Sequence, residues 1–156
     1  LLPSPQQTEL DPASEKKQEN IDAFRRQFAE RIVKLGDAKL QEGGFKLLLA
    51  QGTSAAWAAN LITSEQLPAP DALVLLDGFF PNQLSNQTMA KQVAQASIPT
   101  LDLYQEDGGR WPLLAAEARQ SESRRSHKLN YRPYALMELG ETPGRIQGWL
   151  THLGWI

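Results

Sequence analysis

The sequence predicts an α/β protein in which a parallel sheet carries helices on both faces. Short apolar segments recur along the chain, and segments with helical spacing of apolar residues alternate with them. Near-continuous hydrophobicity over five to eight residues is typical of strands that are covered on both faces, and alternation with helices lets successive strands run the same way. The expected strands are residues 45–50, 72–76, 98–104 and 129–136.

Length and composition fit one globular domain. A chain of 156 residues can remove roughly 70% of its unfolded surface from water. The net charge of -2 provides no basic field, so we expect no nucleic-acid partner. The absence of cysteine excludes disulfides, thiolate metal sites and cysteine catalysis. No metal cluster, phosphate loop or nucleotide glycine pattern is visible, and we expect no cofactor.

Residues 1–19 are predicted to be a polar linker before a domain at 20–156, although Asp11-Pro12 could start a helix early. Leu1-Leu2-Pro3-Ser4-Pro5 resembles the end of a strand that leaves a sheet, and no initiator Met or signal sequence precedes it. We therefore expect a fragment or a processed product. No apolar run reaches the roughly 20 residues of a membrane span.

The first helix is predicted from apolar residues at three- and four-residue spacing, with Gly36 as its C-terminal stop. These residues are Ile21, Phe24, Phe28, Ile32 and Leu35. The strand at 45–50 follows and is expected to be central in the sheet, because it is almost continuously apolar. It runs directly into a second helix that includes Trp57 to Leu61.

The remaining elements repeat this alternation. A helix across Met89 and Val93 follows the strand at 72–76, and another begins near Trp111-Pro112 after the strand at 98–104. The last strand contains Pro133, which cannot donate to a ladder, so we place it at a sheet edge. Thr142-Pro143 is predicted to cap a final helix with an apolar face of Ile146, Trp149, Leu150 and Leu153.

The segment Gly52-Thr53-Ser54-Ala55-Ala56 lies between a predicted strand and a predicted helix. A serine at such a turn occupies a strained backbone position, with its hydroxyl exposed at the edge where parallel strands end. Small neighbours are needed there, because the strand and the helix pass close together. The amide of Ala55 would then be one donor of an oxyanion hole.

This arrangement resembles the second half of the α/β-hydrolase fold: a strand, a nucleophile elbow, Leu73 to Asp77, then Pro99 to Gly108. More closely, residues 20–156 resemble an uncharacterised family of hydrolase-like proteins from Gram-negative bacteria, a domain of unknown function. The segments that carry this resemblance are Ala50-Gln51-Gly52, Asp71 to Leu76, Leu101 to Tyr104 and Leu129 to Arg132. The resemblance implies an exported or periplasmic protein.

The resemblance also assigns residues. Ser54 takes the nucleophile position, Asp107 the acid position after the third strand, and Asp77 the alternative acid position after the second. Each has a plainer interpretation: Ser54 as a helix N-cap and Asp107 as a turn residue before Gly108. Asp102, within a strand, is interpreted as a hydrogen-bonded structural carboxylate.

A serine nucleophile needs a base, and the chain contains only His127 and His152. His127 precedes the last strand, roughly 25–30 Å from Ser54 at the opposite end of a parallel sheet. His152 lies about 13 Å down the final helix. Neither reaches Ser54, and Glu138 or Glu141 would be a weaker base unless burial raised its pKa.

Two surface features complete the expectations. The hydrolase fold takes its second oxyanion donor from a loop after an earlier strand, which this chain lacks. An unpaired apolar flank would then need cover from a protein partner or from a missing N-terminal segment. In addition, basic residues around the last helix–strand connection form either a solvated face or a docking patch for an acidic partner. They are Arg119, Arg124, Arg125, Lys128 and Arg132.

Three hypotheses follow. The chain is a hydrolase-like module without a working triad, which binds a partner or ligand where the strands end. Alternatively, it is a serine hydrolase of the esterase or peptidase type, with Ser54 completed by residues outside the chain. The third alternative is a structural subunit of a larger assembly. Fold-level analogy alone does not choose among them.

Overall fold

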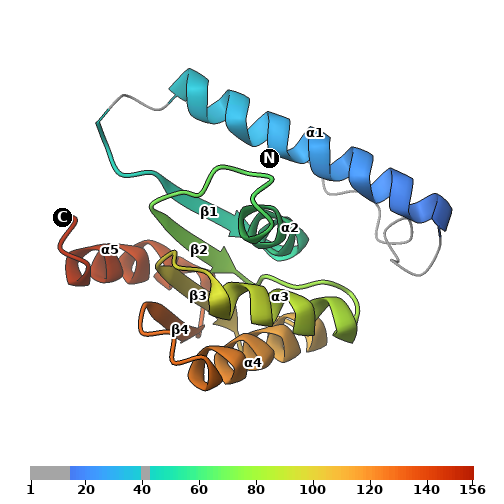
Figure 1. Ribbon diagram of the computed structural model, residues 1–156. Coiled ribbons are helices and arrows are strands. Elements are labelled where there is room, and N and C mark those ends of the chain that lie inside the picture. The colour runs from blue at the N-terminus through green and yellow to red at the C-terminus, as the bar shows by residue number, and fades with distance from the viewer. Residues whose placement is uncertain (1–14, 40–42) are drawn as a thin grey trace.

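The structure, a computed structural model, describes residues 15–39 and 43–156. Its four strands form one parallel sheet in the order β1-β2-β3-β4 (Figure 1). The strands are β1 (Leu47–Gln51), β2 (Ala72–Leu76), β3 (Thr100–Gln105) and β4 (Tyr131–Leu136). The helices are α1 (Glu15–Lys39), α2 (Gly52–Thr63), α3 (Gln83–Gln95), α4 (Arg110–Arg125), η2 (Leu139–Glu141, a 3-10 helix) and α5 (Thr142–His152). The predicted α/β class is confirmed.

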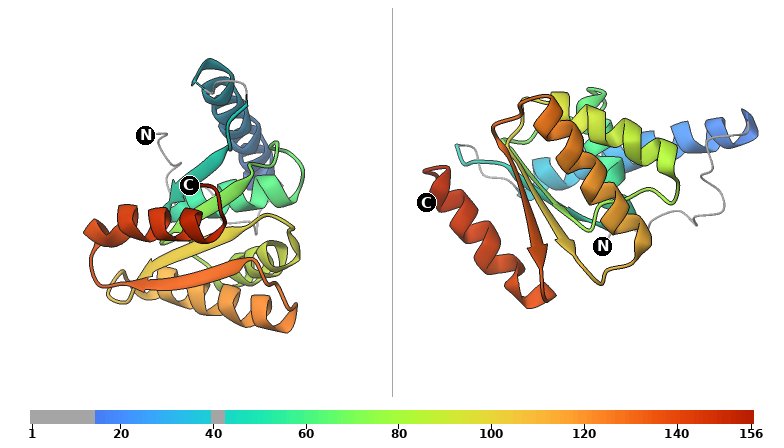
Figure 2. Two further views of the ribbon diagram at one scale, coloured as in Figure 1. Left: turned by 90° about the vertical axis from the view of Figure 1, so that its left-hand side faces the viewer. Right: turned by 90° about the horizontal axis from the view of Figure 1, so that it is seen from below.

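Helices cover both faces of the sheet. Side chains alternate along a strand, so Leu73 and Leu75 of β2 point to one face and Ala72, Val74 and Leu76 to the other. The first face packs against α1, α2, α3 and α4, and the second against α5. Figure 2 shows α5 on the side of the sheet opposite to α3 and α4. We name the two sides the α2 face and the α5 face.

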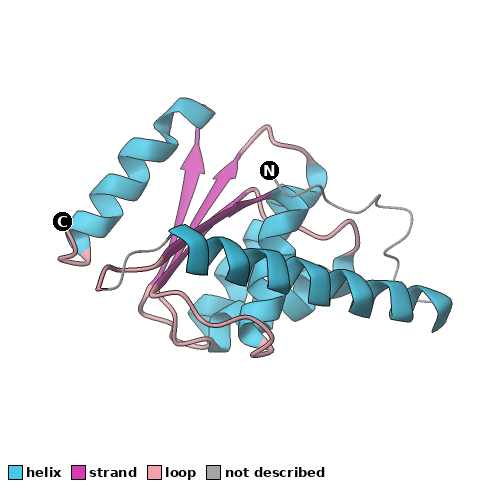
Figure 3. Ribbon diagram, turned by 90° about the horizontal axis from the view of Figure 1, so that it is seen from above, coloured by secondary structure: helices cyan, strands magenta, loops and turns pink. Residues whose placement is uncertain are grey.

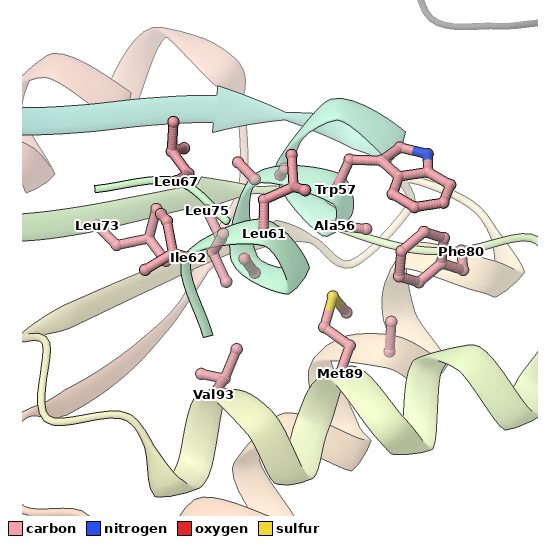
Figure 4. Close-up of a cluster of buried hydrophobic side chains, with 14 of the residues drawn as sticks. Ala56, Trp57, Leu61, Ile62, Leu67, Leu73, Leu75, Phe80, Met89 and Val93 are labelled. Atoms are coloured by element: carbon pink, nitrogen blue, oxygen red, sulfur yellow. The ribbon is translucent and has the colours of Figure 1, made fainter. Parts of the chain in front are cut away.

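The core of the α2 face forms around α2, which is buried on almost every side. Small residues such as Ala56 and Ala59 let this helix approach the sheet closely, and Leu61 and Ile62 fill the space beside β2. Figure 4 shows Met89 and Val93 of α3 and Phe80 pointing into the same cluster. The indole of Trp57 makes edge-to-face contacts with Phe24 of α1 and with Phe80.

The α5 face has a smaller core. Trp149 of α5 is buried against apolar side chains of β2, β3 and β4, with Ile146, Leu150 and Leu153 packed around it, as the spacing predicted. Trp155, beyond the end of α5, stacks on Phe45 with ring centroids 4.3 Å apart. Because α5 lies over the β2–β4 part of the sheet, the side chains of β1 on this face stay exposed.

The four strands end at one edge of the sheet, which we call the carboxyl edge. It consists of residues at or just after the end of each strand: 51–55, 77–80, 105–109 and 137–141. Parallel pairing fixes this alignment, because Gln51 pairs with Leu76 and Gln105 with Leu136. Figure 3 shows the strands running side by side towards this edge. Any site built from strand-end loops lies there.

Several expectations need correction. Gly36 does not end α1, which continues to Lys39, since one glycine costs a helix only about 1 kcal/mol. The strand at 45–50 is not central among the described strands, because β1 pairs with β2 alone there. Thr142 does not cap α5, because the N-cap position is Glu141.

Other expectations are confirmed or lie outside the structure. Pro133 lies at a sheet edge as predicted, because β4 pairs with β3 alone among the described strands. Of the predicted linker 1–19, residues 15–19 are instead the first residues of α1. Residues 1–14, with Leu1 to Pro5 and Asp11-Pro12, lie outside the described residues. Over residues 15–39 and 43–156, no helix combines the length and the apolar character needed to cross a bilayer.

Candidate functional site

The turn after β1 has no loop: the strand ends at Gln51 and α2 begins at Gly52. Gly52 has φ +61°, in the left-handed region that glycine adopts without strain. The left-handed backbone position that was expected at Ser54 therefore belongs to Gly52, and the expectation of a strained backbone at Ser54 is corrected. The chain must reverse at the first residue after the strand, and Ser54 already lies in the first turn of α2 with helical backbone angles.

The turn lies at Gly52, two residues before Ser54, so the helix amides that face it are not the amide of Ala55 that the sequence suggested. An α-helix leaves the amides of its first residues outside its own hydrogen-bond ladder. In α2 these are Gly52, Thr53 and Ser54, and the last two also make other interactions within the chain. The amide of Ala55 is the first that reaches back four residues, to the carbonyl of Gln51. An oxyanion at this turn would therefore face the amides before Ala55, which is itself fully buried.

Asp77, at the end of β2, is buried and also has a positive φ, +48°. Its Oδ1 accepts a hydrogen bond from the backbone N–H of Gln105 at 2.8 Å, and its Oδ2 accepts one from Gln105 Nε2 at 2.6 Å. Both carboxylate oxygens are thus occupied in joining the ends of β2 and β3. Gln105 was missed in the sequence, where a single glutamine after a strand carries no recognisable signal.

Asp107 lies in the exposed turn that follows β3. This turn is closed by a hydrogen bond from the amide of Gly108 to the carbonyl of Gln105, at 3.1 Å. Among the described residues, none hydrogen-bonds to the Asp107 side chain. The structure thus brings the 105–109 loop against Asp77, with Gly108 close to Asp77 Oδ1, and leaves Asp107 pointing into solvent.

The turn after β1 touches the loop after β2. The amide of Phe79 donates to the carbonyl of Gly52 at 3.4 Å. A Cβ added to Gly78 would lie 3.2 Å from the Cβ of Ala55, tighter than ordinary contact. Small residues at 55 and 78 are therefore required, because larger ones would push the two loops apart.

A buried polar network anchors the loop after β2 through the carbonyl of Gly78. Arg119 of α4 forms a bidentate ion pair with Asp102 of β3, Nε to Oδ2 at 2.6 Å and Nη2 to Oδ1 at 2.8 Å. Its Nη1 donates to the carbonyl of Gly78 at 2.6 Å, and the hydroxyl of Tyr131 donates to Asp102 Oδ2. Every charged atom in the network has a partner, as buried charges require. The prediction that Asp102 is a structural carboxylate is confirmed.

Burial and neighbouring charge shift the pKa values of Arg119 and Tyr131. Burial alone would lower the pKa of Arg119, but the charge and hydrogen bonds of Asp102 outweigh it and leave the pKa above its usual value. Burial, reinforced by the charge of Asp102, raises the pKa of Tyr131 far above its usual value. The phenol therefore stays neutral at neutral pH and donates its hydrogen bond to Asp102.

The predicted basic cluster is not one surface. Arg119 is fully buried, which its position on the buried side of α4 with Ala115, Ala116 and Ser123 could have signalled. Arg125 pairs with Glu122 at 2.8 Å. Lys128 Nζ donates to the carbonyls of Ile98 and Ala96, and burial lowers the pKa of Lys128 to about 8. Arg119 thus belongs to a buried ion pair, Arg125 to a surface ion pair, and Lys128 bonds the backbone of the loop after α3.

The two histidines lie away from the turn. His127 is exposed between α4 and β4, at the amino end of the sheet. His152 is the last residue of α5 and is exposed too. Because α5 starts at the carboxyl edge and runs back along the sheet, its end is the part farthest from that edge (Figure 2).

The glutamates after β4 are held by local contacts. Glu141 Oε1 accepts from the amide of Met137 at 2.9 Å and Oε2 accepts from Arg145 Nη2 at 2.7 Å. The hydrogen bond from Arg145 holds the pKa of Glu141 below its usual value, which weakens it as a base. Glu138 completes a capping box with Glu141. No His, Asp and Glu side chains in the described part of the chain cluster as a metal site would require.

Comparison with known proteins gives one finding. No curated protein and no solved structure matches the chain. A family model, DUF3530, described as a protein of unknown function, matches residues 3–155. The match includes the turn at Gly52, the Asp77–Gln105 joint and the buried Arg119 network. The chain therefore belongs to the DUF3530 family of proteins of unknown function.

Proposed function

We propose that the chain is a hydrolase-like module that binds a partner or ligand at its carboxyl edge and does not carry out serine catalysis. The observation that carries this proposal is Gly52. It occupies the positive-φ position between β1 and α2, where the elbow of a serine hydrolase presents its nucleophile, and it has no side chain. A Cβ built there would meet nothing within 4 Å, so the space for a nucleophile exists but is not used.

The arrangement of the elements supports a likeness to the second half of the α/β-hydrolase fold. The strands are ordered in the sheet as they are in the chain. The helices α2, α3 and α4 lie on one face of the sheet, and α5 lies on the other. The sharp strand-to-helix turn at Gly52 is a further feature of that fold. Asp77 lies at the end of β2, where some hydrolases place their acid, but here it joins β2 to β3.

The competing hypothesis is a serine hydrolase in which Ser54 is the nucleophile and Asp107 or Asp77 the acid, completed by residues outside this chain. Ser54 favours it by lying in the first turn of α2, at the carboxyl edge. The structural-subunit hypothesis draws on the exposed side chains of β1.

A fluorophosphonate probe separates the binding module from the enzyme. The proposal predicts that the natural protein is not labelled above the level of the Ser54→Ala variant, because the positive-φ position of the turn is occupied by Gly52, which has no nucleophilic side chain. Mass spectrometry of the labelled peptides gives the measurement. Labelling of Ser54 that the substitution abolishes would establish the hydrolase instead.

The binding half of the proposal is tested with a matched pair of exposed residues. Met137 follows β4 at the carboxyl edge and Leu129 precedes it at the other end, and each is 91% exposed. We expect Met137→Glu to weaken capture of the partner from an extract of the source cells and Leu129→Glu to leave it unchanged. Equal effects of the two substitutions would remove the carboxyl edge from the proposal.

We also propose an exported or periplasmic location, on the resemblance to exported hydrolase-like proteins of Gram-negative bacteria. Fractionation of the source cells, with the protein followed by antibody, tests it. Recovery with the cytoplasmic fraction would contradict it.

A further inference from the structure

The edge of the sheet at β1 exposes apolar side chains. Within residues 15–39 and 43–156, β1 pairs with β2 alone, so alternate N–H and C=O groups along its other side have no strand partner in that part of the chain. The side chains of Leu47 and Leu49 point to the α5 face, beside Ala72 and Val74 of β2. Leu47 is 37% and Leu49 50% exposed, whereas their neighbours on β2 are fully buried.

The position of α1 indicates which part of the polypeptide could cover the open edge of β1. Ile21 and Phe28 of α1 pack with α2 in the core of the α2 face, so α1 lies on the same side of the sheet as α2. Figures 1 and 2 show it beyond β1, at the open end of the sheet. Figure 1 also shows that α1 runs opposite to β1, as a helix that returns the chain between two parallel strands does.

The handedness of such connections then fixes the side. A strand–helix–strand crossover between parallel strands is right-handed in almost all proteins. The crossover from β1 through α2 leads to β2. A strand that precedes α1 and connects through it to β1, with α1 on the same face and with the same handedness, must lie on the side of β1 away from β2. That side is the open edge.

We infer that the open edge of β1 is covered by a parallel β-strand of the same polypeptide, from the chain N-terminal to α1. The strand would pair its backbone with β1 and place apolar side chains beside Leu47 and Leu49. It would also lie under α1, where Val33 and Leu35 are exposed. This assigns the cover to a segment within the chain, and it leaves the carboxyl edge for the proposed binding function.

Thiol protection tests the inference, since residues 1–156 contain no cysteine. Leu49→Cys reports on the edge, and Leu84→Cys, on α3 and 71% exposed, is the control. In the isolated 1–156 chain both thiols should react with a maleimide at similar rates. In the complete natural polypeptide, the thiol introduced at position 49 should react at least about 100-fold more slowly, because modification requires local opening, while the rate at position 84 is unchanged. Peptide mass spectrometry identifies the modified site.

Two further measurements keep the inference falsifiable if a cysteine variant folds poorly. Hydrogen exchange of the unsubstituted proteins should show β1 amides protected in the complete polypeptide and exchanging faster in the 1–156 chain. Cross-strand NOEs from those amides report whether the added strand is parallel. The inference would be overturned if, in the complete polypeptide, the thiol at position 49 reacted as fast as the one at position 84 and the β1 amides were not protected from exchange. Dimerisation of the 1–156 chain with the thiol at position 49 protected would also overturn it, and would assign the edge to a second copy.

Discussion

The ends of β1 and β2 have similar backbone conformations but differ in the hydrogen bonds that hold them in place. Both strands finish at the carboxyl edge with a residue at positive φ, Gly52 after β1 and Asp77 after β2. Asp77 is tied to Gln105 through both carboxylate oxygens, and the next residue, Gly78, is tied through its carbonyl to Arg119. Gly52 accepts a backbone hydrogen bond from Phe79 and has no side chain with which to make another contact.

The difference shows where rigidity is built into the edge. Asp77 tolerates the left-handed conformation because its carboxylate gains two hydrogen bonds there, whereas Gly52 needs no compensation. Polar groups that could have been catalytic are therefore used at β2 to fix the loops. The space above the turn of β1 remains open. The proposed binding role would use an edge whose loop after β2 is fixed by these hydrogen bonds.

The largest expected effect comes from removing the anchor of the β2 end. Arg119→Leu leaves the Asp102 carboxylate and the Gly78 carbonyl buried with fewer partners, and it should reduce the free energy of unfolding by about 3–5 kcal/mol. Urea denaturation measures the change. Arg125→Leu is the control: Arg125 is 70% exposed in a surface pair and should cost about 1 kcal/mol or less.

A triple variant sharpens this test. Replacing the whole network, with Asp102→Leu and Tyr131→Phe added to Arg119→Leu, should recover part of the lost stability, because no charge then remains buried. The role of the network as an anchor would be refuted if Arg119→Leu were no more costly than Arg125→Leu.

An intermediate effect is expected at the β1 end. Gly52→Ala meets no steric obstacle, so it destabilises the fold through the strain of a left-handed alanine, roughly 1–2 kcal/mol. Part of this loss is offset, because alanine lowers the conformational entropy of the unfolded chain. Thermal and urea unfolding give the value. Gly44→Ala, also without neighbours within 4 Å and outside the positive-φ region, should be neutral or slightly stabilising. Equal stabilities of the two variants would show that the turn at Gly52 is not held in this conformation.

The smallest effect is expected at the end of β4. The Arg145 hydrogen bond lowers the pKa of Glu141 in the folded state, so its charge contributes stability above the unfolded pKa, about 4.5, and loses it as pH falls through the folded pKa. Glu141→Gln should be less stable than the natural protein at about pH 7 and equally stable at about pH 2. A difference in unfolding midpoint that does not change with pH would show that the charge contributes nothing.

Much of the fold follows from local pattern. Strands at 72–76 and 129–136, and the helix face of Ile146 and Trp149, were predicted because burial leaves a periodic trace in the sequence. The position of β1 was not. Its apolar run looks the same whether a second neighbouring strand is present or absent. The turn after β1 was predicted from the sequence, but the residue that makes it was not, because the position at which the strand ends determines which residue turns. The role of Ser54 stays a prediction.

By itself, the sequence determined the α/β class, the order of the elements, the edge position of Pro133 and the structural role of Asp102. Each depends on neighbours in the chain or on the cost of burying a polar group. Only the tertiary structure decided that Gly52 makes the turn, that Asp77 bonds Gln105 and that Arg119 lies in the core. These depend on contacts between segments 27 to 41 residues apart, which pack together only after the sheet has formed.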